Sequence, residues 1–492
     1  MKEGKRYDWY PVLCHSFFDE LVTSLYKEVA IYMKWGRGNK RREQSLRPLI
    51  KHVISSLYSC FYSFPIGSGY VSYPLGGDAY NTKSEYKVNY TVVNASALFQ
   101  VLKDKKWITV IPAKNQQSYT RIKASGGLRC IFEEQGFKWS PQKPMPIHKL
   151  VKVRDRVPNT NKNSKKKWDK IDMPLPNEPI VKEYQEELFK YNSFMCHHCV
   201  SLDVTDDQLF EIGKEIRDKQ NDKKRHHNWM AETEEENKIG YLDISSVQLR
   251  RIFSRNSLTK HGRFYGGWWQ SIPSDYRYLI RIDGKLTVEL DYSGISLRIL
   301  YGLAEEPYQG NADIYDLSDN SSVGIKWKFA KDSHQRKLVK KYINALLNDE
   351  DGTFSLTHGE HKQLGFNSKQ IKERFLKVHS PIAHLVDAKI GLQTQFYDSQ
   401  IAMEIMKHFL SFDEVVLPIH DGFIVPAGCV YLLEDEMKNI FKRKFGDKIR
   451  VSHEGLKSPE VINLNDIDYS LYEDSLMENY VDDWRKAYAS EY

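Results

Sequence analysis

The sequence predicts an α+β protein of several domains, and three observations carry that prediction. Its 492 residues are enough for two to four domains of ordinary size. Hydrophobic residues make up 41% and aromatic residues 13%, which excludes a chain that is disordered throughout. Strand-like alternation (TVELD, VVLPI) and helix-like periodicity (SHQRKLVKKYINALLN) occur in separate segments of the chain.

Composition also excludes several classes of protein. Six cysteines scattered over this length do not form a disulfide framework. No apolar run reaches about 18 residues, and the N-terminus carries no secretory signal, so we expect a cytoplasmic protein without a membrane partner. The formal net charge of +7 permits a polyanionic partner.

Residues 1–136 predict an N-terminal α/β accessory domain. A helix is expected over Asn94–Lys106, followed by a hairpin formed by Trp107–Ile111 and Tyr119–Lys123. A helix followed by a hairpin with basic and aromatic residues is typical of winged-helix DNA-binding domains. An ordinary α/β unit is the alternative.

Residues 137–180 read as an extended basic linker, because proline and lysine are frequent there. Such a segment is either simply solvated or contacts nucleic-acid phosphates. Residues 181–260 read as mainly helical.

The segment Thr287–Asp291 predicts a strand with Val288 and Leu290 on one face. The apolar positions that follow it predict a turn and then a helix. Asp291 is therefore expected at the rigid end of a strand, where its carboxylate is held in a fixed place.

A second aspartate is expected at the tip of a hairpin. Asp421 and Gly422 lie between the apolar β runs VVLPI and FIV, and Asp-Gly in that setting is a strong hairpin signal. Two aspartates on neighbouring strands could hold the two divalent ions that phosphoryl transfer needs. The pair His420-Asp421 also fits an HD-type phosphohydrolase, but there the two residues lie on helices.

A helix is predicted over Ser333–Asn348, with Arg336, Lys340, Asn344 and Asn348 close to one face. A basic stripe of this kind is either a solvated face or a clamp for a triphosphate.

These motifs resemble those of family A DNA polymerases of the bacterial polymerase I type, and also those of phage-type single-subunit RNA polymerases. Asp291–Arg298 (DYSGISLR) is similar to motif A of that family, Asp-Tyr-Ser-Gln-Ile-Glu-Leu-Arg. Arg336 and Lys340 match the basic residues of motif B. His420–Phe423 (HDGF) is similar to motif C, His-Asp-Glu or His-Asp-Ser-Phe.

Weaker matches flank these motifs in the same order along about 160 residues. Gly262-Arg263 resembles the family's Thr-Gly-Arg stretch, and Gln270–Pro273 its Leu-Gln-Asn-Ile-Pro stretch. Asp313–Tyr315 resembles Asp-Ile-His, and Ser399-Gln400 the Ser-Gln of the RNA polymerases. The whole is similar to the transposon-and-virus polymerase group, a branch between the two families.

The resemblance implies a right-hand polymerase with palm, fingers and thumb. Palm and fingers would occupy residues 261–450, a thumb-like region 181–260, and a C-terminal extension 451–492. It also assigns roles to individual residues. Asp291 and Asp421 would bind two Mg²⁺ ions (Mn²⁺ is the other candidate) and act in catalysis with Arg336 and Lys340. Nucleotide-binding residues would be Tyr292, through its carbonyl, with Ser296, Tyr315 and Asn344. Primer and template would contact Arg263, Gln270, Gln400 and His420.

Three departures from the family pattern bear on the product. Ser296 replaces the motif A glutamate that excludes ribonucleotides. Asn344 and Asn348 replace the aromatic residue and the tyrosine of motif B. Gly422 stands where the DNA enzymes carry a second carboxylate.

The resulting prediction is a nucleotidyltransferase, namely a DNA-directed DNA polymerase of a mobile element or phage, acting in the cytoplasm of a bacterial or phage-infected cell. Its partners would be a DNA template and primer and nucleoside triphosphates. No Asp-x-Glu exonuclease signature occurs in the first 260 residues, so proofreading is not expected. The alternatives are a primase or single-subunit RNA polymerase that uses ribonucleotides, and a catalytically dead polymerase fold that binds nucleic acid.

Overall fold

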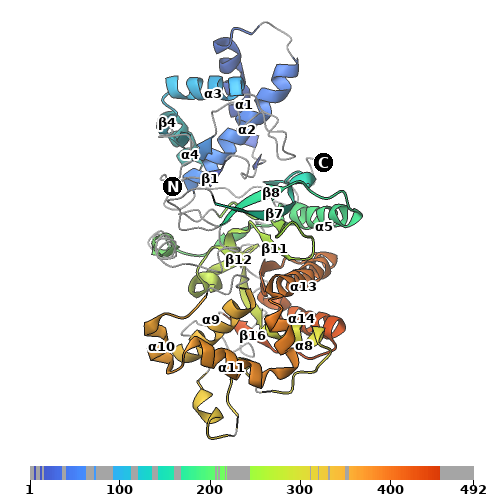
Figure 1. Cartoon of the computed structure of the whole chain (residues 1–492). Coiled ribbons are helices and arrows are strands. Elements are labelled where there is room, and N and C mark those ends of the chain that lie inside the picture. The colour runs from blue at the N-terminus through green and yellow to red at the C-terminus, as the bar shows by residue number, and fades with distance from the viewer. Residues whose placement is uncertain are drawn as a thin grey trace.

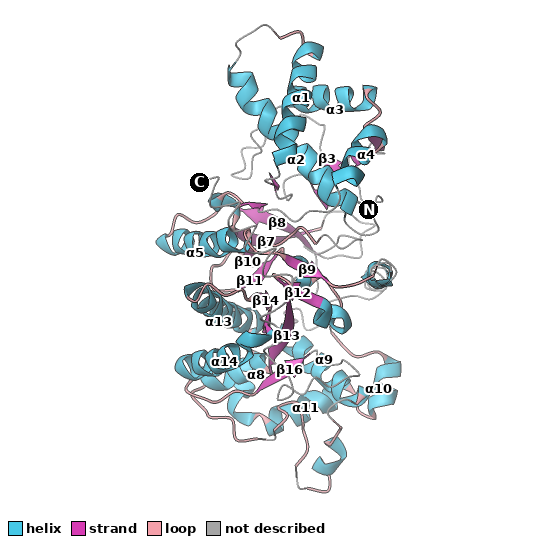
Figure 2. Cartoon of the chain, turned by 180° about the vertical axis from the view of Figure 1, so that it is seen from behind, coloured by secondary structure: helices cyan, strands magenta, loops and turns pink. Residues whose placement is uncertain are grey.

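The computed structural model describes residues 5–6, 12–13, 16–35, 40–62, 71–73, 92–111, 120–135, 142–159, 168–205, 208, 211–216, 218, 244–310, 312–319, 321–330, 333–348 and 354–454. Within these ranges the chain is mixed α and β, as the sequence predicts (Figures 1 and 2). None of the helices described there is both long enough and apolar enough to cross a membrane.

The N-terminal region contains four described helices and a small sheet. The helices are α1 (Ser16–Tyr32), α2 (Lys40–Tyr62), α3 (Val92–Asp104) and α4 (Gly126–Gln135). The described strands run in the order β1 (Lys5–Arg6), β3 (Val71–Tyr73), β5 (Thr120–Ala124) and β4 (Ile108–Ile111). Because β4 and β5 are antiparallel and follow α3, the predicted helix and hairpin are confirmed. The winged-helix interpretation stays a prediction.

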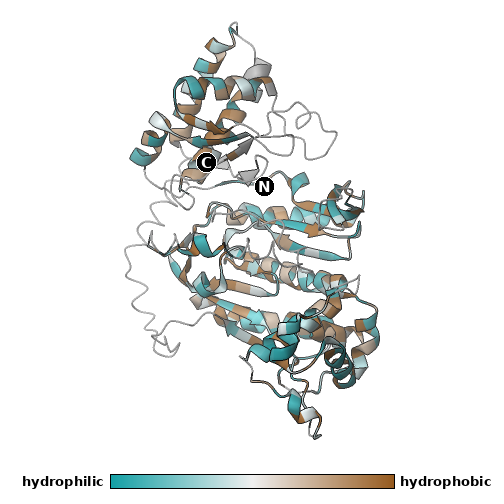
Figure 3. Cartoon of the chain, turned by 60° about the vertical axis from the view of Figure 1, so that its left-hand side comes forward, coloured by the Kyte–Doolittle hydropathy of each residue, from teal (hydrophilic) through white to brown (hydrophobic). Residues whose placement is uncertain are grey.

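This region has its own hydrophobic core. Buried side chains from Phe18 on α1 to Phe132 on α4 form one cluster, to which no described residue beyond Phe132 contributes. Figure 1 places these helices at the top of the molecule, above β7 and β8. Figure 3 shows brown, apolar stretches on them and also on the elements below, which bury a separate core.

The expectation of a linker over residues 137–180 is wrong for the part that the structure describes. This part contains β6 (Gln142–Lys143), paired with β2 (Val12–Leu13), followed by η3 (Ile147–Lys149), β7 (Val151–Pro158) and β8 (Trp168–Met173). The second sheet has the order β11 (His261–Tyr265), β10 (Arg250–Phe253), β7 and β8. Val151 and Val153 are fully buried in it. Valine alternates with charged residues along β7, and this period-2 pattern matters more than the prolines and lysines around it.

The largest sheet crosses several predicted domain boundaries. Its described path is β14 (Leu417–Ile419), β15 (Gly422–Pro426), β13 (Lys285–Tyr292), β12 (Ile280–Ile282) and β9 (Val200–Leu202), and β16 (Val451–Glu454) also pairs with β13. Within the described part, the region 181–260 combines helix, in α5 (Pro179–Met195) and residues 211–216, with β9 and β10, which belong to two different sheets. The C-terminal extension begins with a strand of this sheet, and residues 455–492 lie outside the described part.

Helices pack around this sheet and beside it. They are α8 (Ile295–Leu303), α9 (His334–Asn348), α10 (His358–Leu364), α11 (Ser368–Val378), α12 (Ala383–Asp387), α13 (Gly391–Ser411) and α14 (Val430–Phe445). Residues of α13, α14 and the sheet share the main core. A separate cluster joins α8, α9 and α11, which lie together at the lower end of the molecule (Figure 1).

Candidate functional site

The two predicted carboxylates lie at adjacent strand ends. Asp291 is the penultimate residue of β13 and stands opposite Gly422 of β15. Strands β14 and β15 form a hairpin in which Ile419 pairs with Gly422, so His420 and Asp421 are its two turn residues. The amide N–H of Tyr292 donates to the carbonyl oxygen of Asp421 at 3.2 Å. The predicted hairpin tip at Asp421 is thus confirmed, and it is incompatible with the helical HD arrangement.

The closeness of the two strands favours a glycine at position 422. A Cβ on this residue would lie 3.3 Å from Oδ1 of Asp291 and 3.3 Å from the carbonyl oxygen of Leu290. The Asp291 carboxylate therefore lies directly against the residue that follows Asp421. A glutamate at position 422, as in the DNA enzymes of the resemblance, would need this carboxylate to move.

Asp291 is followed by the predicted turn and helix. Gly294 has φ +68° and precedes α8, where the absence of a Cβ relieves the strain of that conformation. The same glycine lets Ile314 and Tyr315 approach, since a Cβ would lie 2.5 Å from Cγ2 of Ile314 and 3.6 Å from Cε2 of Tyr315. Ser296 is half-buried in the first turn of α8.

Tyr315 lies at the centre of the site. Its side chain is buried, and its hydroxyl donates to Oδ1 of Asn344 at 3.4 Å. The guanidinium carbon of Arg336 is 5.0 Å from the ring centroid, and Nζ of Lys340 is 5.7 Å from it. Burial raises the pKa of Tyr315, and the negative charges of Asp421, Asp313 and Asp291 act in the same direction against the positive charge of Arg336. Tyr315 thus lies within electrostatic reach of both carboxylates and of the basic helix.

The basic stripe on α9 faces this centre. Leu338 and Ile343 are buried on the other side of the helix, whereas Lys340 is exposed. Because Arg336, Lys340 and Asn344 all lie against Tyr315, the prediction that they share one face is confirmed.

Arg263 lies beside the hairpin, where it is held by an aspartate that sequence reasoning missed. Nε of Arg263 donates to both carboxylate oxygens of Asp398, at 3.1 and 3.2 Å, and Nη2 makes a further ion pair with the same group. Burial raises the pKa of Asp398 to about 6, Arg263 opposes that shift, and the charge of Asp421 adds to it. The mutual influence of these three groups places Arg263 and Asp398 close to Asp421.

His420, the other turn residue of the hairpin, lies near Arg263 and is neutral. Its ring centroid is 5.5 Å from that of Tyr265. Burial lowers the pKa of His420 well below its ordinary value, and the positive charge of Arg263 acts in the same direction.

A polar network connects α9 with β11 through α13, and sequence reasoning missed it as well. Nδ2 of Asn348 donates to the carbonyl oxygen of Asn344 at 2.8 Å, and Nε2 of Gln395 donates to Oδ1 of Asn348 at 2.8 Å. Nδ1 of His261 lies 2.6 Å from Oε1 of Gln395, and Nε2 of His261 lies 2.9 Å from the hydroxyl of Tyr265. Polar residues on the buried faces of helices, such as Asp398, are the signal that could have revealed these contacts.

Three predicted site residues have other contacts. The side-chain amide of Gln270 donates to the carbonyl oxygens of Phe264 and Pro418, both at 3.0 Å, and so holds the hairpin in place. Nε2 of Gln400 donates to the hydroxyl of Tyr184 on α5 at 2.9 Å. The Tyr292 side chain is buried and donates to the carbonyl oxygen of Met437 at 2.7 Å. A nucleotide-binding role for Tyr292 would therefore rest on its backbone carbonyl.

The donor set fits a metal that takes most of its ligands from the substrate. Within the described residues, no group of three or more histidine, cysteine, aspartate or glutamate side chains is arranged to hold a metal ion. Asp291 and Asp421 provide two carboxylates, while Asp313 and Asp398 are paired with arginines. Two carboxylates suit Mg²⁺, which prefers a few carboxylates together with phosphate oxygens and water.

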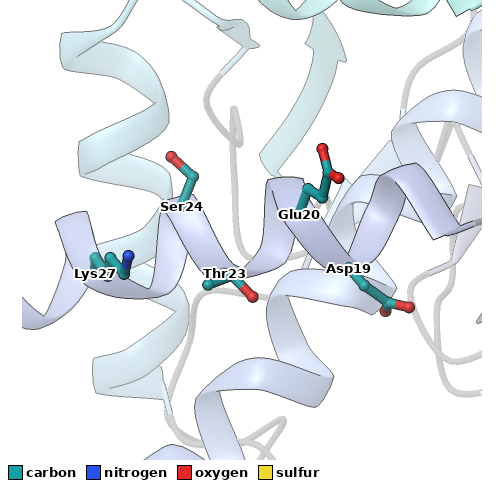
Figure 4. Close-up of a pocket in the computed structure, with 5 residues that line it drawn as sticks. All are labelled: Asp19, Glu20, Thr23, Ser24 and Lys27. Atoms are coloured by element: carbon teal, nitrogen blue, oxygen red, sulfur yellow. The ribbon is translucent and has the colours of Figure 1, made fainter.

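A hollow of about 520 Å³ lies elsewhere, on α1 (Figure 4). It is lined by Asp19, Glu20, Thr23, Ser24 and Lys27, which all belong to that helix. Asp19 is paired with Lys51 of α2 at 2.8 Å. This hollow belongs to the N-terminal core region and shares no lining residue with the aspartate pair.

Comparisons with known proteins do not assign the chain to a family. No family model matches the chain, and no curated protein matches it. Among solved structures, the chain is similar to the POL domain of Pol1 from M. smegmatis in complex with DNA primer-template and dNTP. The two are 14% identical, with a TM-score of 0.28, over 42% of this chain and 47% of that one. The matched part spans about half of that domain, and a likeness at this level establishes neither a family nor an activity.

Proposed function

We propose that this chain is a template-directed nucleic-acid polymerase that extends a DNA primer on a DNA template. One observation carries the proposal. Asp291 and Asp421 lie at adjacent strand ends and share the buried Tyr315 with the basic face of α9. A carboxylate pair opposite a cationic helix suits a reaction in which a triphosphate loses pyrophosphate.

In this proposal the sheet that carries β13 and β15 is the palm, and the helices from α9 to α12 are the fingers. Mg²⁺ ions held by Asp291 and Asp421, when bound, would lower the pKa of the primer 3′-hydroxyl and neutralise the phosphates. Arg336 and Lys340 would bind the triphosphate and stabilise the charge that develops on it. Arg263 and the neutral His420 would contact the primer terminus beside the hairpin.

The test is extension of a labelled primer on a DNA template with Mg²⁺ and deoxynucleotides. Losing one metal-binding carboxylate removes several kcal/mol of transition-state stabilisation, so Asp421→Ala should reduce turnover by roughly a thousandfold or more. The variant should still bind DNA. Asp435→Ala, which removes an exposed aspartate of α14, is the matched control and should behave like the wild type. Equal extension by both variants would overturn the proposal, and so would DNA binding without extension by the wild type.

A second candidate is synthesis with ribonucleotides, and Ser296 favours it. The residue is half-buried in the first turn of α8, four residues after the end of β13, and is smaller than the glutamate of the resembling DNA enzymes. A parallel reaction with ribonucleotides, with and without primer, decides between the two. Extension with ribonucleotides alone, and its loss in Ser296→Glu, would identify a primase or RNA polymerase.

A further inference from the structure

Asp313 lies in the connection between α8 and α9, and its carboxylate makes three contacts in the site. Oδ2 accepts a hydrogen bond from Nε of Arg336 at 2.8 Å, and Oδ1 accepts one from Nη2 of the same residue at 2.8 Å. Oδ1 also accepts from the backbone N–H of Tyr315 at 3.1 Å. One carboxylate thus holds a basic residue of α9 and the backbone of the central tyrosine at the same time.

The two-point contact fixes the plane of the guanidinium. A bidentate carboxylate holds an arginine in one orientation, whereas a single bond leaves it free to rotate. Here that orientation places the Arg336 guanidinium carbon 5.0 Å from the ring centroid of Tyr315. Asp313 engages two of the five N–H donors of the guanidinium.

Asp313 remains charged under ordinary conditions. Burial alone would raise its pKa, but the hydrogen bonds from Arg336 and from the Tyr315 backbone, with the charges of Arg336 and Lys340, hold the pKa below its ordinary value. The two side chains are only partly exposed, 26% for Asp313 and 17% for Arg336, so solvent screens the pair incompletely.

We propose that Asp313 is a positioning residue for the incoming nucleotide. By this inference, Asp313 holds Arg336 ready to bind the triphosphate and fixes Tyr315 between that arginine and the Asp291–Asp421 pair. The inference rests on the proposed function, because it assigns the triphosphate as the anion that Arg336 meets. Lys340 approaches the same ring from the next turn of α9 and meets Asp313 through charge alone in this inference.

The test compares steady-state extension by Asp313→Asn, Arg336→Lys and the double variant. Asparagine keeps the size of the side chain but loses the charge, and lysine cannot form the two-point contact. We expect Asp313→Asn to raise KM for the nucleotide about tenfold while kcat changes less than about threefold. The double variant should match Arg336→Lys within about twofold, because Asp313 acts through that arginine.

Two controls separate positioning from general structure. Asp319 lies in the same connection and pairs with Arg374 at 2.9 Å, so Asp319→Asn removes a comparable ion pair away from Tyr315. It should leave KM unchanged. The increases in KM caused by Lys340→Ala and Asp313→Asn should largely multiply, because Asp313 hydrogen-bonds Arg336 and meets Lys340 only through charge. The inference would be overturned by an unchanged KM in Asp313→Asn or by tighter nucleotide binding in that variant. It would also be overturned if the KM increases of Asp313→Asn and Arg336→Lys multiplied in the double variant.

A binding readout distinguishes failure of this inference from failure of the proposed function. The affinity for a fluorescent deoxynucleoside triphosphate with Mg²⁺ can be measured by anisotropy without any extension. If the wild type binds the nucleotide but extends no primer, the polymerase proposal fails, while weaker binding by Asp313→Asn still supports the positioning role. If the wild type extends primers and Asp313→Asn binds the nucleotide equally well, only the positioning role fails.

Discussion

The buried pair of Arg263 and Asp398 gives a prediction whose size depends on pH. The Asp398 side chain is 1% exposed, and Arg263 holds it through several charge-assisted hydrogen bonds. Arg263→Met keeps an unbranched side chain of similar length but removes the cation. The carboxyl group left behind must then either carry an unpaired buried charge or take up a proton.

The expected loss follows from the pKa of Asp398, which rises on folding from an ordinary 3.8 to about 6. The folded chain therefore holds this proton more tightly than the unfolded chain, and folding stability falls as pH rises from 3.8 until Asp398 ionises. At about 1.4 kcal/mol per pH unit, this costs the wild type about 3 kcal/mol above pH 6. Without Arg263 the carboxyl group stays protonated to a higher pH, so the cost continues to rise between pH 6 and pH 8, by at most about 3 kcal/mol.

The variant should therefore be about 3 kcal/mol less stable than the wild type at pH 8, which matches the usual effect of removing one partner of a buried ion pair. It corresponds to a melting temperature lower by roughly 6 °C for a domain of this size. At pH 5 Asp398 is protonated in both proteins, so the two should melt within about 2 °C of each other. Arg281→Met is the matched control, because the partner of Arg281, Asp203, is 66% exposed and such a pair contributes less than about 1 kcal/mol.

The assay is thermal unfolding of the three proteins, followed by circular dichroism at pH 8 and pH 5. A loss in Arg263→Met that is equally large at both pH values would refute the reasoning, because the loss would then come from packing. No loss at pH 8 would show that Asp398 has another partner.

Three further predictions concern single residues. Gly422→Ala should reduce kcat about tenfold, because its Cβ would displace the Asp291 carboxylate by a few tenths of an ångström. Its melting temperature should stay within about 3 °C of the wild-type value. Primer extension and thermal unfolding measure the two quantities. Burial lowers the pKa of His379 to about 4, so the wild type should lose up to roughly 3 kcal/mol of stability as pH falls from 6.5 to 4. His379→Gln should lose less over the same range. Urea titrations that give both proteins the same pH dependence would contradict this. Thr357→Ala should cost about 1 kcal/mol in the same titration, because it removes the capping box that Thr357 forms with Glu360; a loss below a few tenths would contradict this.

The parts of the fold and site that could be predicted depend on contacts between neighbours in sequence. The hairpin at Asp421 follows from a two-residue turn between apolar runs. The shared face of Arg336, Lys340 and Asn344 follows from the period of a helix. In each case the pattern repeats within a few residues, so it can be read directly from the sequence.

The parts that could not be predicted depend on residues far apart in the chain. Arg263 and Asp398 are 135 residues apart, and the sequence around either residue does not indicate its partner. The same holds for β7, whose pairing with β10 across about 100 residues turns an expected linker into a strand of a sheet. The prolines and lysines around β7 lie outside the strand, and its structure depends on pairing with the neighbouring strands β10 and β8.

Two of the three departures from the resembling motifs, Gly422 and the pair Asn344 and Asn348, fit the packing and hydrogen bonding around them. Gly422 is small where the Asp291 carboxylate needs the space. Asn344 accepts a hydrogen bond from Tyr315, and Asn348 accepts one from Gln395, so the two residues that replace motif B join a network. In a site that had lost its function, substitutions would accumulate independently and leave polar groups without partners, at a cost of about 1–3 kcal/mol for each buried group. Here Asn344 and Asn348 contact each other and Gly422 lies against a carboxylate, while Nδ1 of the unsubstituted His420 has no hydrogen-bond partner among the described residues. This coherence is the physical reason to test for turnover before testing for binding alone.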